Sequence, residues 1–130
     1  MTVYLSIEQL LHIHEKQLRA FGGGSGVRDR SGLEAAVGRP RMTFGGEDLY
    51  PDLAAKAAAL MHPLVMNHPF VDGNKRVGAM AAELMLAANG HDVEAADGEL
   101  AELTFTVARG EVPAEELAIW LRQRMRRHEP

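Results

Sequence analysis

Residues 52–89 read DLAAKAAALMHPLVMNHPFVDGNKRVGAMAAELMLAAN, and this stretch decides the fold. Its two flanks, 52–67 and 74–89, are rich in alanine and leucine and carry apolar residues on more than one helical face. Helices of this kind are buried, so the pattern predicts two helices at the centre of the domain. Pro63 lacks a backbone donor and its ring clashes with the preceding turn, which predicts a kink or an early end in the first helix.

The chain before this stretch predicts a further helix and a loop. Ser6 and Gln9 have the spacing of a capping box, and apolar residues then recur at helical spacing, so we expect a helix over residues 6–20. His14 falls within this periodic set, but His12 and His14 point to different faces, and both are expected to be exposed or half-buried. The glycine-rich loop, residues 22–26, ends the helix, matches no nucleotide-binding glycine motif and is expected to be mobile.

Residues 31–50 predict a short helix followed by an irregular segment. Ser31 to Glu34 has the form of a second capping box, and the helix that it opens has to end before Pro40. Several glycine and proline residues with little periodicity occupy 40–50, which predicts an exposed loop or a small hairpin.

The C-terminal third predicts two more helices. Residues 91–94 are expected to be a connector, and Asp97 is expected to cap a helix that runs to about Arg109. Pro113 suits the first turn of a last helix, whose cationic end complements the helix dipole. The cations at that end are Arg122, Arg124, Arg126 and Arg127.

The bulk properties fit one all-helical domain. A chain of 130 residues that is 46% hydrophobic and 25% charged has the composition of an ordinary soluble protein with a single core. We therefore predict one domain over residues 1–130, an all-α, compact bundle of about six helices with almost no strand. There is no cysteine, which excludes disulfides, thiolate metal sites and a thiol nucleophile.

The same properties limit the partners. A net charge of -4 argues against binding nucleic acid through bulk charge, although it leaves room for a local basic site, so no direct nucleic-acid partner is expected. No apolar run is long enough to span a membrane, and the N-terminus lacks the pattern of a signal peptide. The expected location is the cytoplasm.

The segment His68-Pro69-Phe70-Val71-Asp72-Gly73-Asn74-Lys75-Arg76 carries the chemistry. The start of a helix presents free N–H groups and a partial positive charge, which attract phosphate. Glycine allows a close backbone approach there, asparagine can hydrogen-bond locally, and lysine and arginine add two full charges. We call residues 73–76 the anion cradle.

Two further residues complete this site. Asp72 is unfavourable beside a bare polyphosphate, but it suits a site for Mg²⁺, which takes one or two carboxylates together with phosphate oxygens. His68 lies one short loop before the anion cradle, and its imidazole can serve as the base for a hydroxyl. A tight turn before a helix is the plainer alternative for Asp72 to Asn74, and the neighbouring histidine and cations count against it.

This segment resembles the core motif of the Fic/Doc superfamily, and especially of its Doc (death-on-curing) branch. The Fic pattern is His-Pro-Phe, two residues of which the second is acidic, Gly-Asn-Gly-Arg, and a second arginine three positions later. Here Lys75 replaces the third residue of the tetrad and Ala79 replaces the second arginine, which is the Doc pattern. The N-terminal helix, the glycine-rich loop and the helix end at Asn89-Gly90 are also similar, so the resemblance covers nearly the full chain.

The resemblance implies a fold, an activity and a set of roles. The fold is the Fic/Doc fold, with the motif loop between two central helices, and the cofactors are ATP and Mg²⁺. The activity is that of a toxin that transfers a phosphate from ATP to a protein hydroxyl, with translation elongation factor Tu as the target and arrest of translation as the result. The implied roles are His68 as general base, Asp72 as Mg²⁺ ligand, Gly73 and Asn74 as an anion nest, Lys75 and Arg76 as phosphate ligands, and Phe70 as structural anchor.

Alternatives and regulation follow from the same comparison. The Fic-like His68-Pro69 and Gly73-Asn74 keep transfer of AMP as an alternative, and a catalytically inactive binding module of the same fold is the second. Fic proteins with a built-in inhibitory helix pair its glutamate with the second arginine, which is Ala79 here. The resemblance therefore implies inhibition by a separate Phd-like antitoxin, bound as a helix in a groove, in a type II toxin–antitoxin system.

Overall fold

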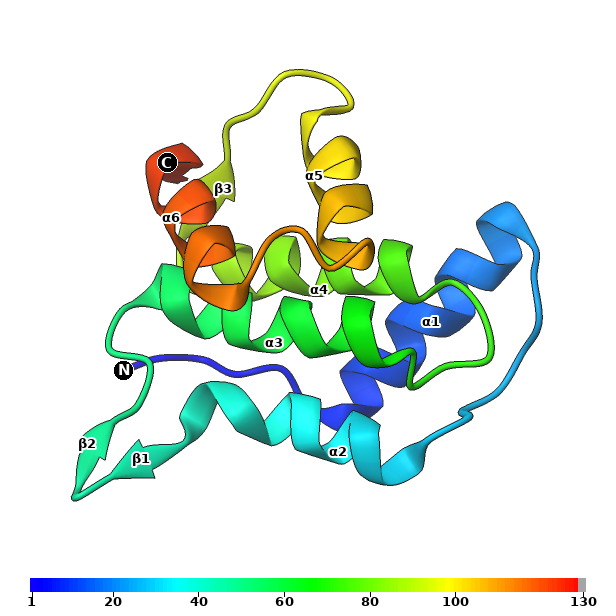
Figure 1. Ribbon diagram of the computed structural model, residues 1–130, viewed down its shortest axis with the longest axis horizontal. Helices are drawn as coiled ribbons and strands as arrows, with labels where there is room; N and C mark the ends of the chain where they lie inside the picture. Colours follow the sequence, from blue (N-terminus) through cyan, green and yellow to red (C-terminus); the bar gives the residue numbers. More distant parts are fainter. Residues whose placement is uncertain (129–130) are drawn as a thin grey trace.

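Two neighbouring helices joined by the motif loop form the centre of the fold. The computed structural model describes residues 1–128. In it α3 (Leu53–Asn67) and α4 (Asn74–Ala88) pack against each other, and residues 68–73, which we call the motif loop, connect them at one end of the molecule (Figure 1). Both helices are largely buried, which confirms the prediction of two central helices.

Four further helices cover this pair, so the prediction of about six helices is confirmed for the described residues. α1 and α5 pack on α4, whereas α2 and α6 pack on α3. Their bounds are Ile7–Phe21 for α1, Arg30–Gly38 for α2, Glu99–Ala108 for α5 and Ala114–Arg124 for α6. None of the helices in residues 1–128 has the length and apolar character needed to cross a membrane.

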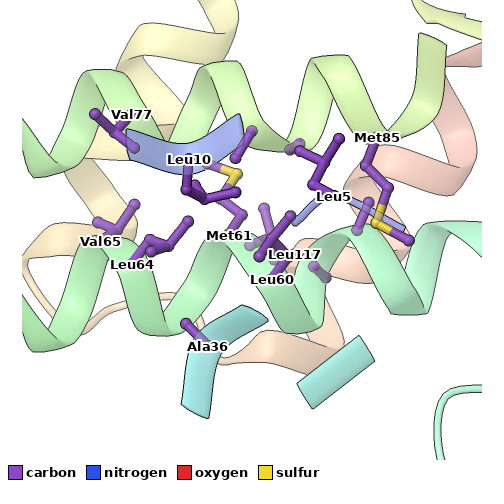
Figure 2. Close-up of a cluster of buried hydrophobic side chains, with 14 of the residues drawn as sticks. Leu5, Leu10, Ala36, Leu60, Met61, Leu64, Val65, Val77, Met85 and Leu117 are labelled. Carbon is purple, nitrogen blue, oxygen red and sulfur yellow. The ribbon is translucent and has the colours of Figure 1, made fainter. Parts of the chain in front are cut away.

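The core lies between α3, α4 and the helices around them. Figure 2 shows Leu10 of α1 among side chains of α3 and α4, including Met61 and Val77, and all three are completely buried. Gly78 lets the two central helices approach closely, because a Cβ atom there would lie 2.5 Å from a methyl carbon of Val65. This packing fixes the two helix ends between which the motif loop is held.

The helix starts follow the expected capping chemistry at one site and differ at two others. The capping box of Ser6 and Gln9 is present, with both reciprocal hydrogen bonds. The second capping box is wrong: the N-cap of α2 is Asp29, whose carboxylate accepts from the Gly32 N–H, while Ser31 donates to that same carboxylate. Asp97 is not a cap either, because α5 begins after Gly98, which has a φ of 81°.

Pro63 does not end α3 early, since the helix continues to Asn67. The lost backbone bond is offset by packing on either side, where Met61, Leu64 and Val65 are fully buried. Pro40 acts as expected: α2 ends before it, and it lies within a single 3-10 turn (Arg39–Arg41).

Short strands pair in two places, one of which the sequence predicted. β1 (Thr43–Phe44) and β2 (Glu47–Asp48) form the small hairpin expected in residues 40–50. β3 (His91–Val93) pairs antiparallel with β4 (Met125–Arg127), where the sequence predicted a connector and a helix end. α6 therefore stops at Arg124, because the backbone of the next three residues pairs with β3.

Candidate functional site

The motif loop begins with a left-handed residue. His68 is the C-cap of α3 with a φ of 47°, and it is the only non-glycine residue with positive φ in residues 1–128. A side chain in that conformation costs about 1–2 kcal/mol. Arg28 holds it there, because its guanidinium donates to the carbonyl oxygens of Asn67, at 3.0 Å, and His68, at 2.6 and 3.0 Å. The imidazole of His68 is thereby left exposed beside the start of α4.

Phe70 and Asn74 close the motif loop on the inside. The Phe70 ring is fully buried, and Asn74 is only 8% exposed. The Asn74 side chain accepts from the Phe70 N–H at 2.9 Å and donates to the Phe70 carbonyl at 3.0 Å. Because the amide is committed to the loop, Asn74 has only its backbone N–H free for an anion at the start of α4.

His14 supports the same loop from α1. Its ring stacks on Phe70 with centroids 4.1 Å apart, and its Nε2 lies 2.9 Å from the Asp72 carbonyl oxygen. It is only 5% exposed, so the expectation of an exposed or half-buried histidine is wrong. The physical reason is that α1 packs on α4 through this face. The signal was present in the sequence, since His14 recurs at helical spacing with the apolar residues Leu10 and Leu18.

The glycine-rich loop lies against the motif loop and orients Asp72. The Gly73 N–H donates to one carboxylate oxygen at 2.8 Å and the Gly24 N–H to the other at 3.3 Å. These two hydrogen bonds, with the nearby Arg76 and Lys75 charges, lower the pKa of Asp72 below its usual value. A Cβ atom at Gly23 would lie 2.7 Å from the carboxylate, so only glycine fits there without a shift.

Backbone pairing joins the two loops along their length. The N–H groups of Arg28 and Asp29 donate to the Pro69 carbonyl at 2.8 and 2.9 Å, and the Val71 N–H donates to the Gly26 carbonyl at 3.0 Å. The segment that the sequence predicted to be mobile thus makes defined contacts with the motif loop. These contacts could not be predicted because the two loops are about 45 residues apart in the chain.

The anion cradle forms the start of α4. Gly73 is the N-cap with a φ of 79°, so no side chain covers the free N–H groups of the first turn. Lys75 and Arg76 are exposed and have no carboxylate within ion-pair distance among residues 1–128. A helix N-terminus with two such cations favours the binding of a polyanion.

A cavity of about 1000 Å³ opens over the anion cradle. Its lining includes all seven of the residues predicted for the site and extends along α4 to α5, where its wall contains Ala79, Met80, Glu83, Leu100 and Thr104. This volume is at the upper end of ligand pockets and accommodates a nucleotide. Partial burial raises the pKa of Glu83, although part of its side chain remains exposed to the cavity.

Asp72 is the one carboxylate of the motif loop. Residues 1–128 contain no group of three or more histidine or carboxylate side chains that could bind a metal by themselves. A single carboxylate beside the anion cradle would suit Mg²⁺, which usually takes its other ligands from phosphate oxygens and water, but it would not suit a metal held wholly by protein.

Comparisons with known proteins agree with this geometry. The model of the Fic/DOC family matches residues 4–86, which include the glycine-rich loop, the motif loop and the anion cradle. "Toxin Doc" of Mycolicibacterium smegmatis (strain ATCC 700084 / mc(2)155) is 49% identical over 90 residues, which are 69% of this chain and 67% of that protein. "Protein kinase doc" of Escherichia phage P1 is 33% identical over 121 residues, which are 92% of this chain and 94% of that protein.

Proposed function

Given that the chain belongs to the Fic/Doc family, we propose that it is a toxin that transfers a phosphoryl group from ATP to a hydroxyl of a protein. The observation that carries this proposal is the exposed His68 imidazole beside an anion cradle whose cations have no carboxylate partner in residues 1–128. Arg28 fixes the position of His68 by donating to its backbone carbonyl oxygen. The names of the two relatives, a toxin and a protein kinase, support the proposal.

The proposed chemistry is an in-line displacement at the γ-phosphorus. His68 takes the proton of the target hydroxyl, whose oxygen attacks the phosphorus as the bond to the bridging oxygen of ADP breaks. The free N–H groups at the start of α4, with Lys75 and Arg76, hold the charge that develops on the phosphate oxygens. Asp72 would bind Mg²⁺, which would neutralise part of the charge of the polyphosphate.

Two substitutions in the motif favour phosphate transfer over transfer of AMP. Lys75 adds a cation where the Fic pattern has glycine, and Ala79 leaves a methyl group in the cavity wall where that pattern has a second arginine. The second guanidinium that orients the terminal phosphates in Fic enzymes is therefore missing. We infer that the γ-phosphate rather than the α-phosphate faces His68, and AMP transfer remains the alternative because His68-Pro69 and Gly73-Asn74 are retained.

The position of the transferred label tests this proposal. Purified chain and its His68→Ala variant are incubated with elongation factor Tu, the target that we propose, and with ATP labelled at either the γ- or the α-phosphate. We expect γ label on the target with the unaltered chain and none with His68→Ala. Label from the α position would instead establish the AMP transferase.

Growth of cells expressing the chain separates both enzymes from an inactive binding module. We expect arrest by the unaltered chain and normal growth with His68→Ala, and equal harmlessness of both would favour the module. We also propose that a Phd-like antitoxin neutralises the chain by folding as a helix into a groove on its surface. Co-expression of the neighbouring gene is expected to restore growth, and continued arrest would contradict this partner.

A further inference from the structure

Two exposed aromatic rings flank the anion cradle. Phe21, the last residue of α1, is 62% exposed, and Phe105 of α5 is 53% exposed. Both rings line the cavity, although they come from helices far apart in the sequence. A single exposed phenylalanine needs no explanation, but each of these two lies against a different cation of the anion cradle.

The contacts are cation–π in geometry. The Arg76 guanidinium carbon lies 4.2 Å from the centroid of the Phe21 ring, and the Lys75 ammonium lies 5.6 Å from the centroid of the Phe105 ring. Both distances are within the roughly 6 Å over which a ring face attracts a cation. Within residues 1–128, each of these two cations thus has an aromatic ring as its side-chain neighbour.

Arg124, which lies outside the cavity, has both kinds of partner. Its guanidinium lies 4.3 Å from the Trp120 ring centroid and also pairs with the Glu99 carboxylate at 2.7 Å. A carboxylate neutralises the charge and occupies N–H donors, so it competes with a phosphate. A ring face does neither, because it holds the cation through its flat side and leaves the charge and the N–H edge available.

We propose that Phe21 and Phe105 are positioning residues that hold Arg76 and Lys75 at the anion cradle while keeping them available for phosphate. The inference rests on the proposed function only in taking a polyphosphate as the occupant of the anion cradle. It requires aromatic character at both positions: tyrosine should replace either ring, whereas leucine, which is also apolar, should not.

Inorganic tripolyphosphate is the probe, because it offers the phosphates of ATP without the nucleoside. Its affinity for the full chain is measured by titration calorimetry. Phe21→Leu and Phe105→Leu are each expected to weaken binding by about two- to fivefold, whereas Phe21→Tyr and Phe105→Tyr retain the original affinity. Phe44→Leu is the matched control, since Phe44 is 82% exposed on the β1–β2 hairpin and does not line the cavity.

A double-mutant cycle separates positioning from a general structural effect. In an Arg76→Gln background the Phe21→Leu change is expected to have no further effect, because the ring acts through the guanidinium. Leucine variants that bind as tightly as the original chain, or the same loss in the Arg76→Gln background, would overturn the inference. Failure of the unaltered chain to bind tripolyphosphate would overturn it as well.

These outcomes are distinct from failure of the proposed function. Tripolyphosphate binding that depends on the two rings supports the inference even if no phosphate is transferred to a protein. Phosphate transfer by the Leu variants with an unchanged KM for ATP would overturn the inference while the proposed function stands.

Discussion

The two ends of α3 are held in different ways. At the N-terminal end, Lys56, only 2% exposed, pairs with Asp48 of the hairpin at 3.0 Å, and the N-cap Asp52 pairs with Arg122 of α6 at 2.7 Å. At the C-terminal end, Arg28 donates to backbone carbonyls and the motif loop is closed by buried Phe70 and Asn74.

The partners of the cations distinguish the two ends: paired charges connect structural elements at one end, and charges unpaired within the described part of the chain mark the candidate site at the other. Charges that meet a carboxylate, as Lys56 and Arg122 do, are neutralised and hold elements together. Lys75 and Arg76 at the other end meet aromatic rings instead, with no carboxylate in ion-pair distance among residues 1–128, so their charge is available to a ligand. The chain carries a net charge of -4, yet two cations without a carboxylate of the described residues in ion-pair distance line the cavity beside His68.

The largest effect is expected from removing the buried ring of the motif loop. Phe70→Ala should lower the free energy of unfolding by about 3–5 kcal/mol, because a fully buried phenyl ring leaves a cavity under the loop. Urea denaturation measures this. Val71→Ala is the control, since Val71 is 53% exposed and a change below about 1 kcal/mol is expected. Equal effects of the two changes would mean that the core does not anchor this end.

A smaller loss is expected when the loop loses its internal hydrogen bonds. Asn74→Ala leaves the buried N–H and carbonyl of Phe70 without their partner, which should cost about 2 kcal/mol in urea denaturation. We also expect phosphate transfer to fall, because His68 and the start of α4 are no longer held at a fixed separation. Full stability together with full activity would contradict this account of the C-terminal end.

Gly23→Ala is expected to lower the free energy of unfolding by about 1 kcal/mol, because alanine is strained at a φ of 119°. It is also expected to raise the Mg²⁺ concentration that half-maximal activity requires. The added Cβ displaces the Asp72 carboxylate, from which it would lie 2.7 Å. Gly22→Ala is a matched control, because Gly22 also has positive φ but an added Cβ would contact nothing within 4 Å. The same Mg²⁺ dependence in both variants would count against the role of the glycine-rich loop.

The smallest effect is expected at the N-terminal end, and it should depend on pH. A hydrogen bond from Arg122 is the main cause that lowers the pKa of Asp52. The carboxylate therefore contributes stability above its unfolded pKa of about 3.9, and this contribution is lost as the pH falls through the lower folded pKa.

Asp52→Asn tests this contribution, because asparagine retains the N-cap but not the charge. Its destabilisation in urea should stay below about 1 kcal/mol at neutral pH, since the ion pair is about half exposed, and should vanish as the solution is acidified below pH 4. A difference that does not change with pH would show that the charge is not involved.

The local parts of the fold could be predicted from the sequence. Alanine-rich stretches without a polar face predicted α3 and α4, and the capping box at Ser6 predicted α1. The pairing of β3 with β4 could not be predicted, because it joins three-residue segments more than 30 positions apart, with no alternating pattern in either. Ser31 is predicted as a cap because Glu34 follows it at capping-box spacing, but Asp29 offers an equivalent capping oxygen two residues earlier and forms the cap.

The candidate site likewise has local residues that the sequence predicted and distant supporting residues that it did not. The motif is contiguous, so the sequence presented its seven predicted residues together. Their supporting partners come from other elements: His14 from α1, Arg28 from the segment before α2, and the two rings from α1 and α5. Nothing in the local sequence of these residues indicates which loop they contact, since that depends on how the helices pack.

The most direct test is a titration of the isotopically labelled chain with MgATP, followed by amide NMR. It shows whether the ligand binds at the C-terminal end of α3 and leaves the N-terminal end unaffected. We expect saturable shifts at the amides of Asn74, Lys75 and Arg76, whose N–H groups are free at the start of α4, and no shift at Ala55, whose N–H is bound by the Asp52 cap. Shifts confined to the N-terminal end of α3, or none that saturate, would contradict the assignment of the ATP site to the motif loop.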